Sequence, residues 1–204
     1  MIRDKIKLMK MLGLSSLLSC AVAASAGAGQ APSNKALKAA GLNSSVVATA
    51  VPSANDARSQ AEMTARADHK AVFLVFHASW CIWCKRLDAM MDDPTVKPVW
   101  DKYFVTVHID GLENAAQKNQ ENSGWETMLD FYKGKGSGIP YFVFLGPSGG
   151  VLADSRDPAN MGYPAGAKDE SAFLGDVIRA TPAITSAEVK VLKDYLEKNN
   201  YGQP

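Results

Sequence analysis

Two cysteines with two residues between them, Cys81 and Cys84, come shortly after a continuous apolar run from Val72 to Phe76. Such a run is typical of a strand that is buried on both faces of an α/β sheet, and the residues from Lys85 to about Met91 are compatible with a helix. A helix N-terminus carries partial positive charge and free N–H groups, which stabilise a thiolate. This placement lowers a cysteine pKa from about 8.5 to about 3.5–7.5. The pair is therefore a candidate redox or metal site.

The rest of the chain does not supply the partners that a metal or haem site needs. A structural zinc site needs four ligands, and the chain has neither a second C-x-x-C nor an H-x-x-x-H. A haem attachment motif needs histidine after the second cysteine, where Lys85 stands instead. We expect no metal and no organic cofactor. A structural disulfide remains an alternative to a redox pair.

Length, charge and cysteine content limit the class of protein. The chain has 204 residues, enough for one domain with flanking segments, and only three cysteines, too few for a disulfide-stapled scaffold. Its formal net charge is +1 and it has no basic stripe, which argues against a nucleic-acid partner.

The N-terminus has the pattern of a targeting segment. Basic residues precede an apolar, small-residue-rich stretch, and Ala24-Ser25-Ala26 offers a cleavage site, so residues 1–26 are predicted to be a signal peptide. Alternatively, Leu17-Leu18-Ser19-Cys20 resembles a lipobox, in which Cys20 would be lipidated. Both interpretations predict an exported protein, periplasmic or held at a membrane by lipid, in an oxidising compartment. Residues 27–53 are predicted to be a flexible linker.

Further elements are predicted along the chain from periodicity and capping signals. They are a helix over 54–69 with Asn55 or Asp56 as N-cap, a turn or short helix over 96–100, strands over 103–109, 141–145 and 151–154, and a helix over 169–179. The last two strands form an antiparallel hairpin. Trp125, Met128, Leu129 and Tyr132 recur at helical spacing, and Thr185 with Glu188 predicts a capping box for a final helix.

Two separated motifs resemble the thioredoxin family between about Val72 and Arg179. The first, Trp80 to Lys85, is similar to W-C-x-x-C-K, and the second is Gly138-Ile139-Pro140 directly before a strand. The resemblance implies an α/β, thioredoxin-like fold over residues 54–200, with a central mixed sheet of about four strands flanked by helices and an added C-terminal helix. It also implies a cis Ile139–Pro140 bond. Residues 93–96 and 104–110 resemble the exported thiol:disulfide interchange branch.

The same resemblance implies a role for each site residue in thiol–disulfide exchange with protein substrates and a redox partner protein. Cys81 is expected to be the exposed, low-pKa nucleophile, and Cys84 the resolving thiol. The backbone of Ile139 beside Pro140 would pair with a substrate chain. The apolar rim for that contact would consist of Trp80, Ile82 and Trp83.

The sequence departs from thioredoxin at the residues that tune the pair. Ile82-Trp83 replaces the usual Gly-Pro, and Val75 stands where a buried aspartate is expected, which leaves His77 as a candidate proton acceptor for Cys84. The stretch between the second strand and Pro140 is also longer than in thioredoxin. The alternative function is a non-enzymatic binding module that keeps the same pair oxidised.

Overall fold

The fold is built on one mixed sheet of four strands, seen in a computed structural model that describes residues 50–156 and 159–201. The strands are β1 (Ala71–His77), β2 (Phe104–Asp110), β3 (Tyr141–Leu145) and β4 (Val151–Asp154), in the order β2-β1-β3-β4. β1 pairs parallel with β2 and antiparallel with β3, which pairs antiparallel with β4. β1 is central because its apolar run leaves no polar face for water: every residue from Ala71 to Phe76 is buried.

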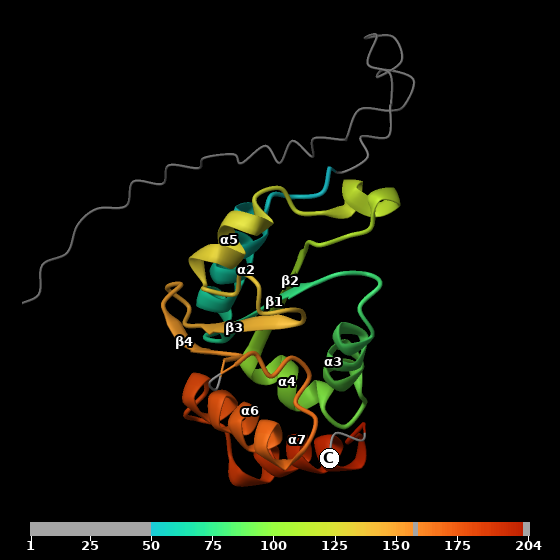
Figure 1. Cartoon of the computed structure of the whole chain (residues 1–204). Helices are drawn as coiled ribbons and strands as arrows, with labels where there is room; N and C mark the ends of the chain where they lie inside the picture. The colour runs from blue at the N-terminus through green and yellow to red at the C-terminus, as the bar shows by residue number, and fades with distance from the viewer. Residues whose placement is uncertain (1–49, 157–158, 202–204) are drawn as a thin grey trace, which may run out of the picture. The chain divides into compact units, whose positions relative to one another are not determined.

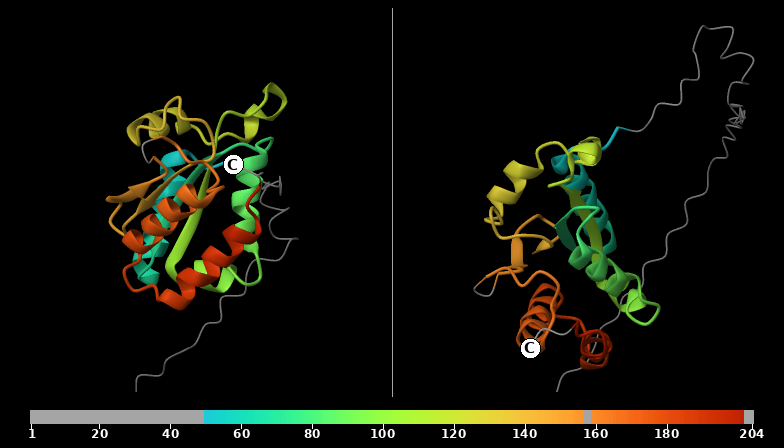
Figure 2. Two further views of the ribbon diagram at one scale, coloured as in Figure 1. Left: turned by 60° about the horizontal axis from the view of Figure 1, so that its bottom comes forward. Right: turned by 45° about the vertical axis from the view of Figure 1, so that its right-hand side comes forward.

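Helices cover both faces of this sheet (Figure 1). One face packs against α3 (Ile82–Asp92), α4 (Lys97–Tyr103), α6 (Ala167–Ala180) and α7 (Ser186–Lys198), through a core that includes Phe73, Trp100 and Phe173. The other face packs against α2 (Ala54–Asp68) and α5 (Trp125–Phe131), through a core that includes Leu74 and Tyr141. Figure 2 shows α6 and α7 next to each other at the C-terminal side of the domain. This is the predicted α/β, thioredoxin-like architecture with an added C-terminal helix.

β2 leads into a long connection to β3. This connection is the longer stretch before Pro140 that is expected from the sequence, and we call it the insertion. It contains the short 3-10 helix η1 (Ala115–Gln120) and α5 before it reaches β3. Asn122 joins the insertion to the start of the domain: its side-chain amide donates to Pro52 O at 2.9 Å and its Oδ1 accepts from Asp110 N at 2.6 Å. The insertion is therefore held against the sheet.

One helix N-cap and one helix start differ from the prediction. α2 is capped by Ser53, whose Oγ accepts from Asp56 N at 3.1 Å, so the prediction of Asn55 or Asp56 as N-cap was wrong. The helix itself begins at the predicted residue, Ala54, which is buried and whose N–H donates to Ser123 O. α3 begins at Ile82, three residues before the predicted start, because Cys81 acts as its N-cap.

The signal peptide, Cys20 and the predicted linker up to residue 49 lie outside the described residues. Among the residues that are described, no helix is both long and apolar enough to cross a membrane.

Candidate functional site

Cys81 and Cys84 form a disulfide at the N-terminus of α3. Cys81 is the N-cap residue of the helix, and its Sγ accepts a hydrogen bond from Cys84 N at 3.1 Å. The first turn contains no acidic residue, so no carboxylate there opposes negative charge at Cys81. When the bond is reduced, the same N–H and the helix dipole favour a thiolate at Cys81.

Both cysteines are buried, and this corrects the expectation that Cys81 is exposed. Cys81 is 4 % exposed and Cys84 is 1 % exposed. The burial of Cys81 has a structural cause, because its sulfur lies against the loop before β3, 3.6 Å from Ile139 O. Its neighbours Trp80 and Ile82 are instead 51 % and 56 % exposed. The two residues that flank Cys81 in the sequence therefore expose apolar surface, while the disulfide itself is buried.

The loop of residues 137–140 brings a backbone edge to the disulfide. The peptide bond between Ile139 and Pro140 is cis. Pro140 is buried, whereas Gly138 is exposed and has φ +81°, a conformation that glycine adopts without strain. The loop thus places the carbonyl of Ile139 beside Cys81 while its other side faces solvent.

Trp80 and Trp83 have different surroundings, although both were predicted to form one apolar rim with Ile82. The Trp80 indole donates to Leu112 O at 2.9 Å, so its exposed ring is held by the insertion. Trp83 packs in an aromatic cluster with Tyr163 and Tyr201, and the guanidinium of Arg86 lies 4.3 Å from its ring centre. Trp83 therefore connects the cysteine pair with the C-terminal part of the domain.

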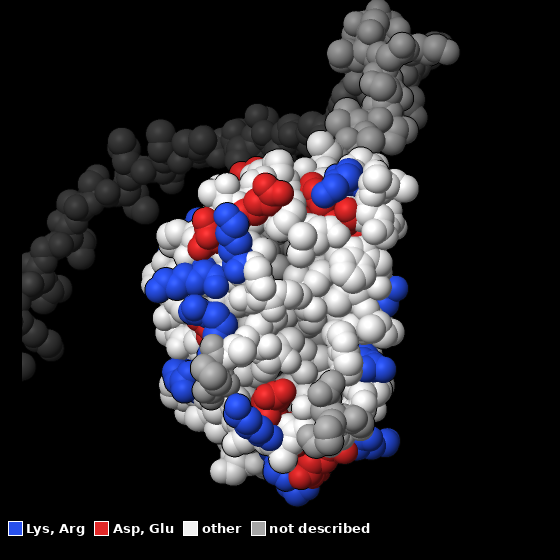
Figure 3. Space-filling view, viewed as in Figure 1, with Lys and Arg blue, Asp and Glu red and all other residues white. Residues whose placement is uncertain are grey.

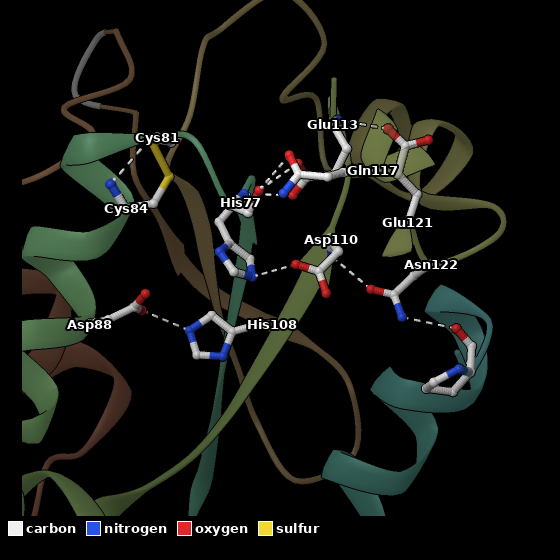
Figure 4. Close-up of polar contacts among 12 residues, drawn as sticks. His77, Cys81, Cys84, Asp88, His108, Asp110, Glu113, Gln117, Glu121 and Asn122 are labelled. Carbon is white, nitrogen blue, oxygen red and sulfur yellow. Dashed lines mark hydrogen bonds and ion pairs between the residues drawn. A yellow bond between two sulfur atoms is a disulfide. The ribbon is translucent and has the colours of Figure 1, made fainter. Parts of the chain in front are cut away.

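Glu113, which the sequence interpretation missed, holds the turn before the cysteines (Figure 4). Its carboxylate is 5 % exposed and accepts from Ser79 N at 2.5 Å and from Ser79 Oγ at 2.8 Å. Ser79 follows β1 and Glu113 follows β2, and the carboxyl ends of neighbouring parallel strands lie at one edge of a sheet. From this topology, the sequence analysis could have predicted that Glu113 lies near the residues before Cys81.

His77 belongs to a polar network beneath α3 (Figure 4). Its Nε2 lies 2.7 Å from Asp110 Oδ1, and its ring is 4.6 Å from that of His108, which in turn bonds Asp88 at 2.9 Å. Asp88 lies one helical turn after Cys84. The contacts of the described residues do not join His77 to either sulfur, so its role as proton acceptor stays a prediction.

Within residues 50–156 and 159–201, no three His, Cys, Asp or Glu side chains are grouped to hold a metal ion.

Two pockets meet at the 137–140 loop, and both are lined by Gly138. The larger has a volume of about 600 Å³ and includes Leu112, Trp125 and Leu129 of the insertion. The smaller, of about 280 Å³, includes Trp83, Asn160 and Tyr163. Figure 3 shows that the surface between α3 and α5 carries no charged side chains over its centre, with Lys and Arg gathered toward its edges. A chain could therefore lie across the loop without burying unpaired charge.

A mixed sheet with a C-x-x-C disulfide at a helix start, beside a cis-proline loop, defines a thioredoxin-fold protein. Residues 53–147 match the family model described as thioredoxin-like, so this stretch is similar to that family.

Solved structures with similarity to the chain include three proteins. A disulphide isomerase from Xylella fastidiosa is 20 % identical, with 71 % of this chain and 91 % of that chain covered and a TM-score of 0.39. A DsbH oxidoreductase is 26 % identical over 62 % of this chain and 82 % of that chain, with a TM-score of 0.40. The oxidised C-terminal domain of DsbD from Neisseria meningitidis is 26 % identical, covering 52 % and 84 %, with a TM-score of 0.36. No curated protein sequence matches the chain.

Proposed function

We propose that the protein is a thiol–disulfide oxidoreductase that exchanges disulfides with protein substrates through Cys81 and Cys84. One observation carries the proposal: Cys81 Sγ caps a helix through Cys84 N at 3.1 Å and lies 3.6 Å from the backbone carbonyl of Ile139. The first contact stabilises a thiolate, and the second places that sulfur beside the backbone of Ile139.

The exchange proceeds through a mixed disulfide in either direction. With the pair reduced, the Cys81 thiolate attacks one sulfur of a substrate disulfide, and the other substrate sulfur leaves as a thiolate. The Cys84 thiolate then attacks Cys81 Sγ and releases the second substrate thiol, so the substrate gains two electrons and the protein is left as the disulfide. With the pair oxidised, a substrate thiolate attacks Cys81 Sγ and the same steps run in reverse. A redox partner protein restores the starting state.

The surface around Cys81 suits a peptide substrate. Backbone groups of Ile139 can pair with an extended chain, which gives affinity without demanding a particular sequence. The side chains of Trp80 and Ile82, which flank Cys81 in the sequence, are exposed to solvent. They can cover apolar side chains of the substrate.

The first test separates an oxidoreductase from a binding module. The full-length chain and its Cys81→Ser, Cys84→Ser and Cys20→Ser variants are assayed for insulin reduction and for reoxidation of reduced ribonuclease A. We expect Cys20→Ser to match the wild type, Cys81→Ser to fall to the blank rate, and Cys84→Ser to accumulate a mixed disulfide with substrate. A Cys81→Ser protein as active as the wild type would overturn the proposal, and a wild type inactive in both assays that still binds reduced protein would favour the binding module.

The equilibrium of the cysteine pair with glutathione gives the direction of the reaction in the cell. A reduction potential near about −270 mV indicates a reductant, and one near about −120 mV an oxidant.

The protein is further proposed to work outside the cytoplasm, either in the periplasm or anchored to a membrane through Cys20. Support comes from the basic and then apolar N-terminal sequence. Mass spectrometry of the N-terminal peptide from the mature protein distinguishes the alternatives. Cleavage after Ala26 gives an unmodified peptide that starts at Gly27, whereas lipidation gives a peptide that starts at a modified Cys20. A peptide that retains Met1 to Lys10 would contradict both.

A further inference from the structure

The side chain of Asn160 touches the 137–140 loop at three points. Its Nδ2 donates to Ser137 O at 3.1 Å, to Gly138 O at 3.2 Å and to Pro140 O at 3.1 Å. These carbonyls lie on both sides of Ile139, the residue whose own carbonyl faces Cys81. A single amide therefore fixes the backbone before and after the residue that lies beside the disulfide.

The other end of the same amide is anchored in the core. Asn160 Oδ1 accepts from Ser155 Oγ at 2.6 Å and from Gly162 N at 3.2 Å. Ser155 is fully buried at the end of β4, and its backbone and hydroxyl both bond to Phe142 of β3, at 3.0 and 3.3 Å. Asn160 is thus a rigid connection between the loop and the sheet.

The solvent side of the loop contains a residue without a side chain. Gly138 is exposed and adopts φ +81°, and pockets of about 600 and 280 Å³ lie on either side of it. Backbone carbonyls that keep a fixed direction present a preorganised edge, whereas mobile ones must be ordered when a substrate binds, which weakens binding.

We propose that Asn160 is a positioning residue that holds the Ile139 backbone in place for peptide substrates, an inference that rests on the proposed exchange activity. Asn160 does not touch the sulfurs, so it acts on substrate pairing and not on the electron transfer itself. Its effect is specific to substrates that have a peptide backbone. A small disulfide such as 2-hydroxyethyl disulfide reacts at Cys81 without using the edge.

The test compares insulin with 2-hydroxyethyl disulfide in the full-length protein and its Asn160→Asp variant. Aspartate has the same shape and keeps the acceptor for Ser155 Oγ and Gly162 N, but it loses all donors to the three carbonyls. The loss of these hydrogen bonds to the loop is expected to raise KM for insulin about tenfold, while the rate with 2-hydroxyethyl disulfide stays within about twofold of the wild type.

Asn122→Asp is the matched control. Like Asn160, Asn122 donates to a backbone carbonyl, here Pro52 O, and accepts from a backbone N–H, here Asp110 N. Asn122→Asp should lower thermal stability and change the activity toward both substrates by the same factor.

If Asn160→Asp leaves KM for insulin unchanged, or lowers the activity toward both substrates equally, the inference is wrong. If that variant does not fold, Ser155→Ala decides, since it frees the anchored end of Asn160: a rise in KM for insulin alone supports the inference, and equal effects overturn it. A wild type that reduces neither disulfide and also fails to reoxidise reduced ribonuclease A would refute the proposed function itself.

Discussion

At the scale of single residues, Gly111 shows how tightly the insertion is packed beside the redox site. Gly111 directly follows β2, and its N–H donates to His77 O at 3.0 Å. A Cβ at this position would lie 2.5 Å from Cδ2 and 2.7 Å from Cε3 of Trp125. Trp125 is 9 % exposed and forms part of the core under α2 and α5. Only a residue without a side chain lets the indole and the strand end approach this closely.

Gly111→Ala should therefore destabilise the protein. The added methyl group overpacks a rigid site, which costs about 1–3 kcal/mol. Urea unfolding followed by circular dichroism at 222 nm measures the difference. Gly150→Ala is the control, because a Cβ there meets nothing within 4 Å and should leave the midpoint almost unchanged. Equal midpoints for the two variants would show that Trp125 yields to the methyl group.

The site residues that belong to local sequence motifs were predicted. The site residues whose contacts are with residues far away in the sequence were missed. The cysteines stand in a recognisable motif, and Pro140 stands directly before a strand. Asn160 and Glu113 occur in polar stretches with no local signal, and their importance comes from contacts with residues 20–34 positions away. Chain topology was needed to find them.

At the scale of elements, α7 is joined to α4 through Glu188. Its carboxylate completes the capping box predicted from the sequence by accepting from Thr185 N at 2.9 Å. It also accepts from Lys102 Nζ at 2.7 Å and from the Tyr103 hydroxyl at 2.8 Å. The hydrogen bond from Lys102, followed by those from Thr185 and Tyr103, lowers the pKa of Glu188 from 4.5 to about 2.

Replacing Glu188 should make stability depend less on pH. Because the folded-state pKa is depressed, the charge stabilises the fold above about pH 4.5 and its contribution is lost as the pH falls toward 2. Glutamine keeps the shape and can still serve a capping box, so Glu188→Gln removes mainly the charge. Thermal melts should show a lower Tm for the variant at pH 6–7 and a difference that closes by about pH 2. A difference that stays constant across this range would mean that charge is not what Glu188 contributes.

Most elements were predictable because their signals are local. β3 and β4 have the predicted bounds, and the capping box of α7 was confirmed. The start of α3 was predicted three residues too late, since cysteine is not among the usual N-cap residues. Here the Cys81 sulfur accepts the N-cap hydrogen bond that a serine or aspartate oxygen normally accepts. Ser53 was missed because the linker composition continues up to the first helical residue.

At the scale of the whole molecule, the sheet divides the core in two. Odd-numbered residues of β1, such as Phe73 and Val75, face α3, α4, α6 and α7, and even-numbered ones, such as Leu74, face α2 and α5. The thioredoxin-like arrangement could be predicted from two motifs in the correct order. The packing of the insertion on α2 could not, because its polar sequence has no periodicity before Trp125 and its position depends on single contacts such as that of Asn122 with Pro52.

The strand order also determines what the growing polypeptide exposes during synthesis. Translation produces β1, the cysteines, α3 and β2 before it produces the 137–140 loop, and β3 must enter between β1 and the later β4. Until then β1 has an unpaired edge, both halves of the core lack the strand that they share, and Cys81 lacks the backbone that buries it. A nascent chain that stops short of Tyr141 thus presents an unpaired strand edge next to two accessible thiols. The docking of β3 covers this edge of β1 and shields Cys81 in the same step.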